Sequence, residues 1–235
     1  MCNVVSNAAQ HSLDWFRARL GYITGSNVGL IMKSGKGKVF SDTAENYLYD
    51  VAGDRTLNKR IIESDEMFEE YLKLRDVSSK AMRWGNEQEP NARALYVAKT
   101  GIEMVEVGSC RHSSIPFFAS SPDGFHYNEN NGEKICLEIK CLGQKEYMKY
   151  LHLVKDGNSL LKVNPQYFYQ CHSHMMVTDA IATDFVVYNP FQDMPIHIIR
   201  IEKDDTIADL IGDRVKLGND FIKDIIESRT CLRTA

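Results

Sequence analysis

The sequence predicts an α/β (α+β) fold in which helices flank a central mixed β-sheet. Helical periodicity dominates the first third of the chain, strand patterns dominate the middle, and helices alternate with strands afterwards. A chain of 235 residues can form one domain with a sizeable core, and neither a linker nor a repeat divides it. We therefore expect a single domain over residues 1–235, with an N-terminal helical part over about 12–78 and a core over about 79–230.

Polar capping residues and apolar periodicity mark the expected helices. Thr24 and Ser26 are both suited to cap the second helix, and Gly101 suits the left-handed residue that ends a long one. Pro90 within that long helix is expected either to kink it or to begin a new first turn. The expected helices cover about residues 12–20, 24–32, 43–51, 79–100, 144–154, 165–177 and 205–228.

Strands are expected where β-branched and aromatic residues alternate with polar ones. Two of them flank Asn128-Glu-Asn-Asn-Gly132, which is expected to be a turn because Asn-Gly is a strong hairpin signal. The expected strands cover residues 102–107, 117–120, 124–127, 134–140, 184–188 and 196–202.

The composition restricts how this protein could bind nucleic acid. Its formal net charge is −4, whereas a protein that coats DNA non-specifically usually carries a basic surplus. A phosphate-binding surface would therefore be local, within a cleft or channel. The basic, glycine-rich stretch Lys33-Ser-Gly-Lys-Gly-Lys38 is either a phosphate contact or a solvated turn, and its sequence favours neither.

The sequence argues against a membrane protein and against a secreted one. No apolar run approaches the roughly 18 residues of a membrane span, and the N-terminus lacks the basic and apolar regions of a secretory leader. We therefore expect a cytoplasmic protein. Six cysteines are present without any Cys-x-x-Cys pair, so we expect reduced thiols and no zinc ribbon or redox motif.

A candidate metal site lies on the expected hairpin. Side chains alternate along a strand, so Glu138 and Lys140 project from one face while Ile139 points to the other. Asp123 lies at the turn that opens the hairpin, within Ser121-Pro-Asp-Gly124, and can reach the same point. Two carboxylates and the Ile139 carbonyl oxygen form the hard oxygen set that Mg²⁺ prefers, and Lys140 could hold an attacking water beside the metal.

Glu89 is a further candidate ligand. It lies on the expected long helix in a stripe with Gly85, Ala92 and Tyr96, at three- and four-residue steps. A carboxylate on an inward stripe needs a cation or a metal as its partner.

Simpler interpretations compete with this site. Glu138 and Lys140 could be an exposed ion pair on a strand, and Asp…Glu-x-Lys alone is a weak pattern. Cys171, His172 and His174 suggest zinc, but residues one and two apart on a helix point in different directions, so we interpret them as partly buried helix residues.

Five ordered blocks resemble the lambda-exonuclease-like, YqaJ-like viral recombinase family within the PD-(D/E)XK nuclease superfamily. The resemblance covers about residues 12–225. The blocks are Arg19-Leu-Gly-Tyr-Ile-Thr-Gly-Ser26, Trp84-Gly-Asn-Glu-Gln-Glu-Pro-Asn-Ala-Arg93, Ser121-Pro-Asp-Gly124, Leu137-Glu-Ile-Lys-Cys141 and Tyr169-Gln-Cys-His-Ser-His-Met-Met-Val-Thr178.

The resemblance implies a PD-(D/E)XK core and a role for each matching residue. Lys140 matches the catalytic lysine, Glu89 the auxiliary acidic residue, and Gln170 the helix glutamine that approaches the site. Asp123, Glu138 and the Ile139 carbonyl match the metal ligands. Arg19, Ser26 and Ser121 match a pocket for a terminal 5′-phosphate, a task that suits the bidentate fork of arginine.

The function implied by the resemblance is a Mg²⁺-dependent 5′→3′ exonuclease acting on 5′-phosphorylated ends of double-stranded DNA in phage-type recombination. Two Mg²⁺ ions are implied, with Mn²⁺ as a possible substitute, together with a trimeric ring and a single-strand annealing protein as partner. A ring would retain DNA topologically despite the acidic net charge. Two alternatives remain: an endonuclease or single-strand-preferring nuclease of the same fold, and a non-catalytic DNA-end-binding module.

Overall fold

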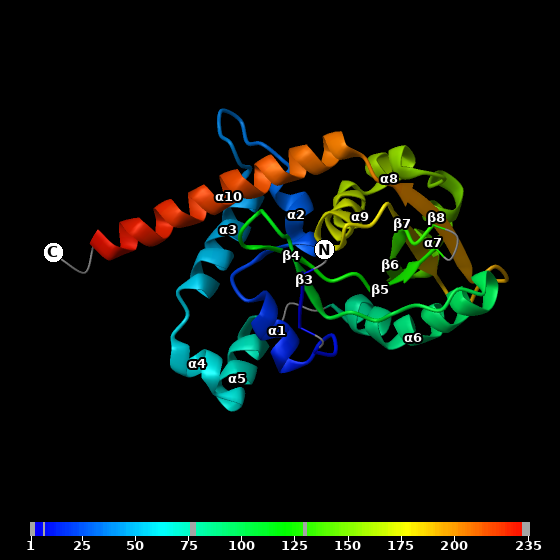
Figure 1. Cartoon of the computed structure of the whole chain (residues 1–235), viewed down its shortest axis with the longest axis horizontal. Coiled ribbons are helices and arrows are strands. Elements are labelled where there is room, and N and C mark those ends of the chain that lie inside the picture. Colours follow the sequence, from blue (N-terminus) through cyan, green and yellow to red (C-terminus); the bar gives the residue numbers. More distant parts are fainter. Residues whose placement is uncertain (1–2, 7, 76–78, 129–130, 232–235) are drawn as a thin grey trace.

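The computed structural model describes residues 3–6, 8–75, 79–128 and 131–231. Helices of the N-terminal part lie on one side of the molecule, and the strands that follow residue 123 lie on the other (Figure 1). The helices are α1 (Leu13–Arg19), α2 (Gly25–Ile31), α3 (Asp42–Arg55), α4 (Lys59–Glu63), α5 (Asp65–Arg75), α6 (Lys80–Thr100), α7 (Gln144–Leu153), α8 (Gly157–Val163), α9 (Pro165–Thr178) and α10 (Asp205–Cys231). The strands are β1 (Asn3–Ser6), β2 (Ile23–Thr24), β3 (Ser109–Arg111), β4 (Phe118–Ser120), β5 (Gly124–Tyr127), β6 (Lys134–Cys141), β7 (Ala182–Tyr188) and β8 (Ile196–Glu202).

The described strands form two mixed sheets of four strands each. The first has the order β1-β3-β4-β2 and the second the order β5-β6-β7-β8. Each contains one parallel pair, β2 with β4 and β6 with β7, and the remaining pairs are antiparallel. The expected mixed α/β class is therefore confirmed, although the strands divide between two sheets.

The expected strand over 102–107 is wrong. The segment forms only an isolated bridge between Val105 and Phe125. Its side chains do alternate, because Ile102 and Met104 pack against apolar residues while Val105 is exposed. Alternating burial thus reports one-sided packing of an extended chain, not a hydrogen-bonded ladder. The expected elements also omitted β1, β2, β3, α4, α5 and α8, which the structure contains.

The long helix α6 begins and ends where its capping residues predict. The Ser79 hydroxyl accepts a hydrogen bond from the Met82 N–H, and Gly101 has a φ of 70° in the left-handed region. Pro90 lies within the helix, which continues through it. Glu89 is therefore held by an unbroken helix over the second sheet.

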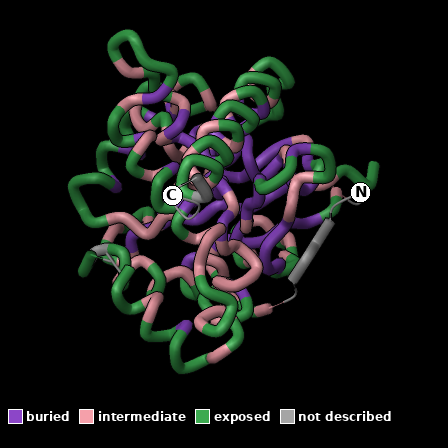
Figure 2. Tube along the Cα trace, turned by 90° about the vertical axis from the view of Figure 1, so that its left-hand side faces the viewer, coloured by how far each residue is buried: buried purple, intermediate pink, exposed green. Residues whose placement is uncertain are grey.

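The second sheet carries apolar side chains on both faces. Leu137 and Ile139 of β6 pack on α6 together with Ala92 and Tyr96. Cys136, on the opposite face of the strand, belongs to the larger core with residues of α2, α3, α9 and α10. The buried residues, purple in Figure 2, gather in the middle of the molecule. The expected alternation along β6 is confirmed, and it turns Glu138 toward α9.

The basic loop at 33–38 is held by ion pairs and hydrogen bonds to neighbouring residues. Lys38 pairs with Asp42 and Glu45, at 3.2 and 3.3 Å between Nζ and the carboxylate oxygens. Arg214 of α10 donates hydrogen bonds to backbone carbonyls at Ile31, Lys33 and Val39. These partners favour the solvated turn over a phosphate contact. Across the described residues, no helix is both long and apolar enough to span a bilayer.

Candidate active site

The turn that carries Asp123 is bonded to β6. The Asp123 N–H donates to the Leu137 carbonyl at 3.0 Å, and Asp123 Oδ2 accepts from the Ile139 N–H at 2.6 Å. A second contact comes from Gln10, whose side chain donates to the Pro122 carbonyl. The Asp123 side chain is therefore fixed against the strand that carries Glu138 and Lys140, in a residue only 9% exposed.

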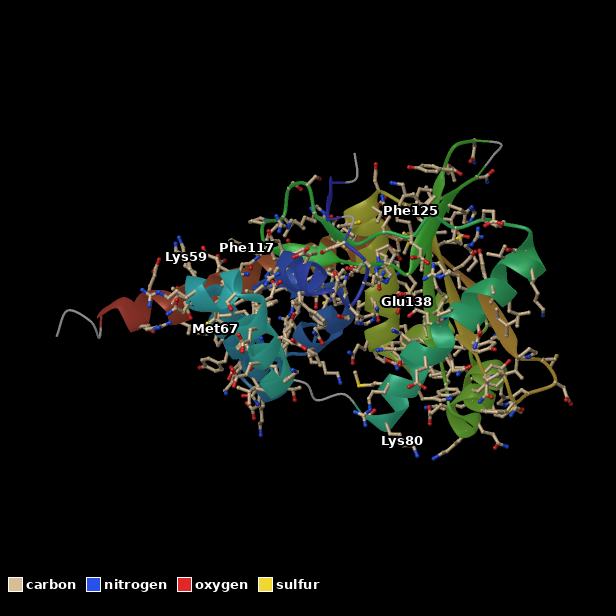
Figure 3. All side chains as sticks on the ribbon, turned by 90° about the horizontal axis from the view of Figure 1, so that it is seen from below. Lys59, Met67, Lys80, Phe117, Phe125 and Glu138 are labelled. Atoms are coloured by element: carbon tan, nitrogen blue, oxygen red, sulfur yellow. The ribbon has the colours of Figure 1, made fainter. Side chains whose placement is uncertain are left out.

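Glu138 and Lys140 form a close pair on the same face of β6. Lys140 Nζ lies 2.5 Å from Glu138 Oε1 and 4.9 Å from the ring centre of Tyr167 on α9. Glu138 is 1% exposed and lies near the centre of the molecule (Figure 3). The interpretation as an exposed ion pair is therefore wrong, because the carboxylate is buried.

The two buried carboxyl groups differ in their electrostatic surroundings. Burial by itself raises the pKa of Glu138, but Lys140 and His174 outweigh it and lower that pKa to about 2. Burial, Glu138 and Glu89 together raise the pKa of Asp123 well above its usual range. Burial disfavours the Lys140 ammonium, yet Glu138 and Asp123 raise its pKa overall. Negative charge at Asp123 is thus under-compensated, and a cation bound there would relieve it.

Glu89 lies on α6 at the edge of this site. Arg93, one turn further along, contacts Glu89 Oε1 at 3.0 Å and also donates to the Asp123 backbone carbonyl. Glu89, Arg93 and Asp123 line a pocket of about 630 Å³. The partner that a carboxylate in this stripe requires is therefore a cation, Arg93. Glu89 still adds to the negative field at Asp123.

Helix α9 presents one row of side chains to β6. Tyr167 contacts Lys140, and His174, seven residues later, contacts Glu138. Gln170 is buried on the turn between them. Gln170 therefore shares the helix face that carries Tyr167 and His174, and its role in the site stays a prediction.

His174 is a site residue that the sequence interpretation missed. Its Nε2 lies 2.5 Å from Glu138 Oε2, and its Nδ1 lies 2.8 Å from the Ser120 Oγ. A signal was present, because His174 follows Gln170 by four residues and so shares its helix face. The sequence interpretation considers His174 only as a candidate zinc ligand.

Cys171, His172 and His174, interpreted from the sequence as partly buried helix residues, are all buried on α9. His172 packs on the Phe168 ring, whereas His174 points to Glu138 and Ser120. Within the described part of the chain, no three His, Cys, Asp or Glu side chains are grouped as a metal site. A metal held here would depend on Asp123, Glu138 and a backbone carbonyl, so Glu89 as a direct ligand stays a prediction.

Arg19 lines a second pocket and is hydrogen-bonded to both Ser26 and Ser121. Arg19 donates to Ser121 Oγ at 2.6 Å and to Ser26 Oγ at 3.4 Å. Its guanidinium stacks 4.2 Å from the Trp15 ring. Burial lowers the pKa of Arg19 to about 10, which leaves it charged near neutral pH. No carboxylate of the described chain forms an ion pair with Arg19, so its charge is free to bind an anion.

The chain is similar to a known protein family and to solved exonuclease structures. The family model for the YqaJ-like viral recombinase domain matches residues 14–181. The alkaline exonuclease LHK-Exo from Laribacter hongkongensis is 28% identical, with a TM-score of 0.75 over 95% of this chain and 100% of that one. Its complex with dAMP gives the same values. No curated protein sequence matches this one.

A more distant solved structure has the same fold. The phage related exonuclease from Haemophilus somnus 129PT is 16% identical, with a TM-score of 0.61 over 88% of this chain and 96% of that one. At that identity the likeness concerns the fold alone.

Proposed function

Because this chain belongs to the family of YqaJ-like viral recombinase domains, we propose that it is a metal-dependent exonuclease that degrades duplex DNA from a 5′-phosphorylated end. Its mixed α/β fold is that of PD-(D/E)XK-type exonucleases. One observation carries the proposal: a single turn supplies both Ser121 and Asp123, and so connects Arg19 to the candidate metal site. Ser121 contacts Arg19, while Asp123, two residues later, is bonded to β6 between Glu138 and Lys140.

The residues present fit a hard divalent cation. Asp123, Glu138 and the Ile139 carbonyl would hold Mg²⁺, since carboxylate and carbonyl oxygens are its preferred ligands. The raised pKa of Asp123 supports this, because a nearby cation would stabilise the ionised form. When bound, the metal supplies Lewis acidity to the phosphate and lowers the pKa of water. Two ions are proposed, with Mn²⁺ as a substitute and Glu89 near the second.

Lys140 would act on the phosphate as a cation. The neighbouring carboxylates keep its pKa raised, so in this environment Nζ retains its proton. An ammonium at this position would stabilise charge that develops on the phosphate oxygens and could donate a hydrogen bond to the attacking water. Gln170, buried on the facing helix, would orient the same water or the phosphate.

The Arg19 pocket would determine polarity. Guanidinium binds a phosphate through two parallel hydrogen bonds, and the hydroxyls of Ser26 and Ser121 add polar partners. A terminal phosphate carries more negative charge than an internal one, so a buried arginine without a carboxylate partner favours an end. The first phosphodiester bond would then lie at the metal site, and product release would free a nucleoside monophosphate. The relative from Laribacter hongkongensis, which was solved with dAMP, supports that product class.

The proposal extends to the assembly. Arg19 and Ser26 come from the N-terminal helical part and Glu138 from the core, so we propose that the whole chain acts as one nuclease domain. A trimeric ring around double-stranded DNA would retain the substrate despite a net charge of −4. A single-strand annealing protein in the same cytoplasm would receive the exposed strand.

The test compares linear and covalently closed duplex DNA in Mg²⁺. We expect digestion of the linear form alone, faster with 5′-phosphate than with 5′-hydroxyl ends, and none in EDTA. Equal cutting of closed circles would favour the endonuclease alternative, and faster loss of single strands the single-strand-preferring one. Glu138→Gln should abolish digestion but retain DNA binding, whereas Glu133→Gln on the exposed hairpin should change neither. Binding without digestion by the wild type would favour the end-binding module.

A further inference from the structure

His174 is enclosed between Glu138 and Ser120. Each of the three residues is 1% exposed. The two imidazole nitrogens are both engaged, Nε2 with Glu138 Oε2 at 2.5 Å and Nδ1 with Ser120 Oγ at 2.8 Å. The ring therefore joins β4 to β6 through helix α9.

Hydrogen-bond chemistry fixes the direction of the contact with Glu138. An ionised carboxylate only accepts, so the hydrogen between His174 and Glu138 belongs to Nε2. The Ser120 hydroxyl can either donate to Nδ1 or accept from it, so the second contact is formed in either tautomeric state. Two hydrogen bonds therefore connect Ser120, His174 and Glu138.

Both ends of the histidine are themselves held. The His174 carbonyl accepts from Thr178 Oγ1 at 2.7 Å. Ser120 lies against Gly25 so closely that a Cβ at Gly25 would come within 2.0 Å of Ser120 Oγ. Ser120 and His174 are each 1% exposed, so packing restricts the movement of the imidazole.

Glu138 consequently has a different partner on each oxygen. Oε1 is contacted by Lys140 and Oε2 by His174. Lys140 is a flexible chain that a cation could displace, whereas His174 is a rigid ring enclosed on all sides. Of the two contacts, only the one from His174 can hold the carboxylate in one orientation throughout binding and reaction.

We propose that His174, supported by Ser120, is a positioning residue that fixes the Glu138 carboxylate for divalent metal binding. This inference rests on the proposed function only in that it takes Glu138 as a metal ligand. Outer partners of metal ligands commonly affect metal affinity or activity by about 10- to 100-fold. We expect an effect of that size at His174.

Two amide substitutions separate the two contacts of the imidazole. The amide nitrogen of His174→Gln can occupy the place of Nε2 and donate to Glu138, whereas the amide of His174→Asn reaches only as far as Nδ1 and contacts Ser120. Calorimetry of Mn²⁺ binding without DNA is the primary readout. We expect affinity within about 3-fold of wild type for His174→Gln and about 10- to 100-fold weaker for His174→Asn.

His172→Asn is the matched control. His172 is a second buried histidine on α9, but it packs on Phe168 and does not contact Glu138. We expect it to lower the melting temperature without changing Mn²⁺ affinity. Ser120→Ala gives a second measurement that keeps the imidazole, and we expect a smaller loss of affinity in the same direction.

The outcomes distinguish this inference from the proposed function. Wild-type Mn²⁺ affinity in a folded His174→Asn variant would overturn the inference, as would equal losses for Asn and Gln. If His174→Asn does not fold, unchanged affinity in Ser120→Ala would overturn it. The expected order of affinities in a protein that digests no DNA would leave the inference standing and reject the function. A wild type that binds no Mn²⁺ would reject both.

Discussion

The carboxylate of Asp123 accepts a hydrogen bond from the backbone N–H of Ile139, with 2.6 Å between Oδ2 and N. Ile139 separates Glu138 from Lys140 on β6, so this bond holds the acidic turn in register with the strand. Burial and the negative charges of Glu138 and Glu89 raise the pKa of the Asp123 carboxyl group. The site therefore has an electrostatic cost in the metal-free protein.

Asp123→Asn should stabilise the metal-free protein while abolishing digestion. The amide oxygen can still accept from the Ile139 N–H, but it carries no charge. A carboxyl with a raised folded pKa contributes its full stability below the unfolded value of about 3.9 and loses it as pH rises through the folded pKa. The advantage of the variant should therefore increase with pH from about 4 upward. Urea unfolding in EDTA at several pH values measures this, and a gap that does not vary with pH would contradict it.

Lys140→Met should reduce digestion by about 100-fold or more while Mn²⁺ binding is retained. The substitution removes the ammonium 2.5 Å from Glu138 but leaves the oxygen ligands in place. Single-turnover digestion and calorimetry measure the two effects separately. Lys134→Met is the control, because Lys134 lies on the same strand and donates to the Thr178 carbonyl. A rate within 10-fold of wild type would remove Lys140 from the mechanism.

Arg19→Ala should abolish the preference for 5′-phosphorylated ends. A hydrogen bond to a charged group contributes about 1.5–3 kcal/mol, which corresponds to about 10- to 100-fold in kcat/KM. Arg19→Lys keeps the charge but not the fork, so it should recover only part of the preference. The assay compares phosphorylated and unphosphorylated linear duplex. Arg17 lies on the same helix as Arg19 and forms ion pairs with Asp14 and Asp65, so Arg17→Ala should keep the preference.

Gly25→Ala should destabilise the protein by about 1–3 kcal/mol, the usual cost of overpacking. Its Cβ would lie 2.0 Å from Ser120 Oγ and 3.0 Å from Ser173 Cβ, both on packed elements. Gly53→Ala on α3 is the opposite case, because nothing lies within 4 Å of the added carbon. That substitution should stabilise by about 0.5–1 kcal/mol, since alanine favours helix. Denaturant unfolding of both variants checks the contrast.

Local chemistry explains the parts of the fold that could be predicted. Ser79 caps the start of α6 and Gly101 its end through contacts with neighbouring residues. Side chains of β6 alternate between two faces because a strand has a period of two. Such features depend on a few adjacent side chains. By contrast, residues 102–107 have strand character but are joined to another strand only at Val105, because pairing depends on which neighbour the fold supplies.

The candidate site likewise contains residues that the sequence brings together and residues that only folding brings together. Asp123, Glu138 and Lys140 belong to one hairpin, so their proximity follows from the sequence alone. Arg19 and Ser121 are 102 residues apart, and their contact was implied only by resemblance. The sequence places His174 on the same helix face as Gln170, but only the tertiary structure brings that face to Glu138.

The sequence by itself determined the fold class, the two carboxylates and lysine of the hairpin, and the family. Tertiary structure decided the electrostatic surroundings of each carboxyl group. The negative charge of Asp123 is under-compensated, whereas Glu138 lies between Lys140 and His174. The physical reason is that a period and a turn are fixed by adjacent residues. Burial, hydrogen-bond partners and pKa depend on side chains that only folding brings together.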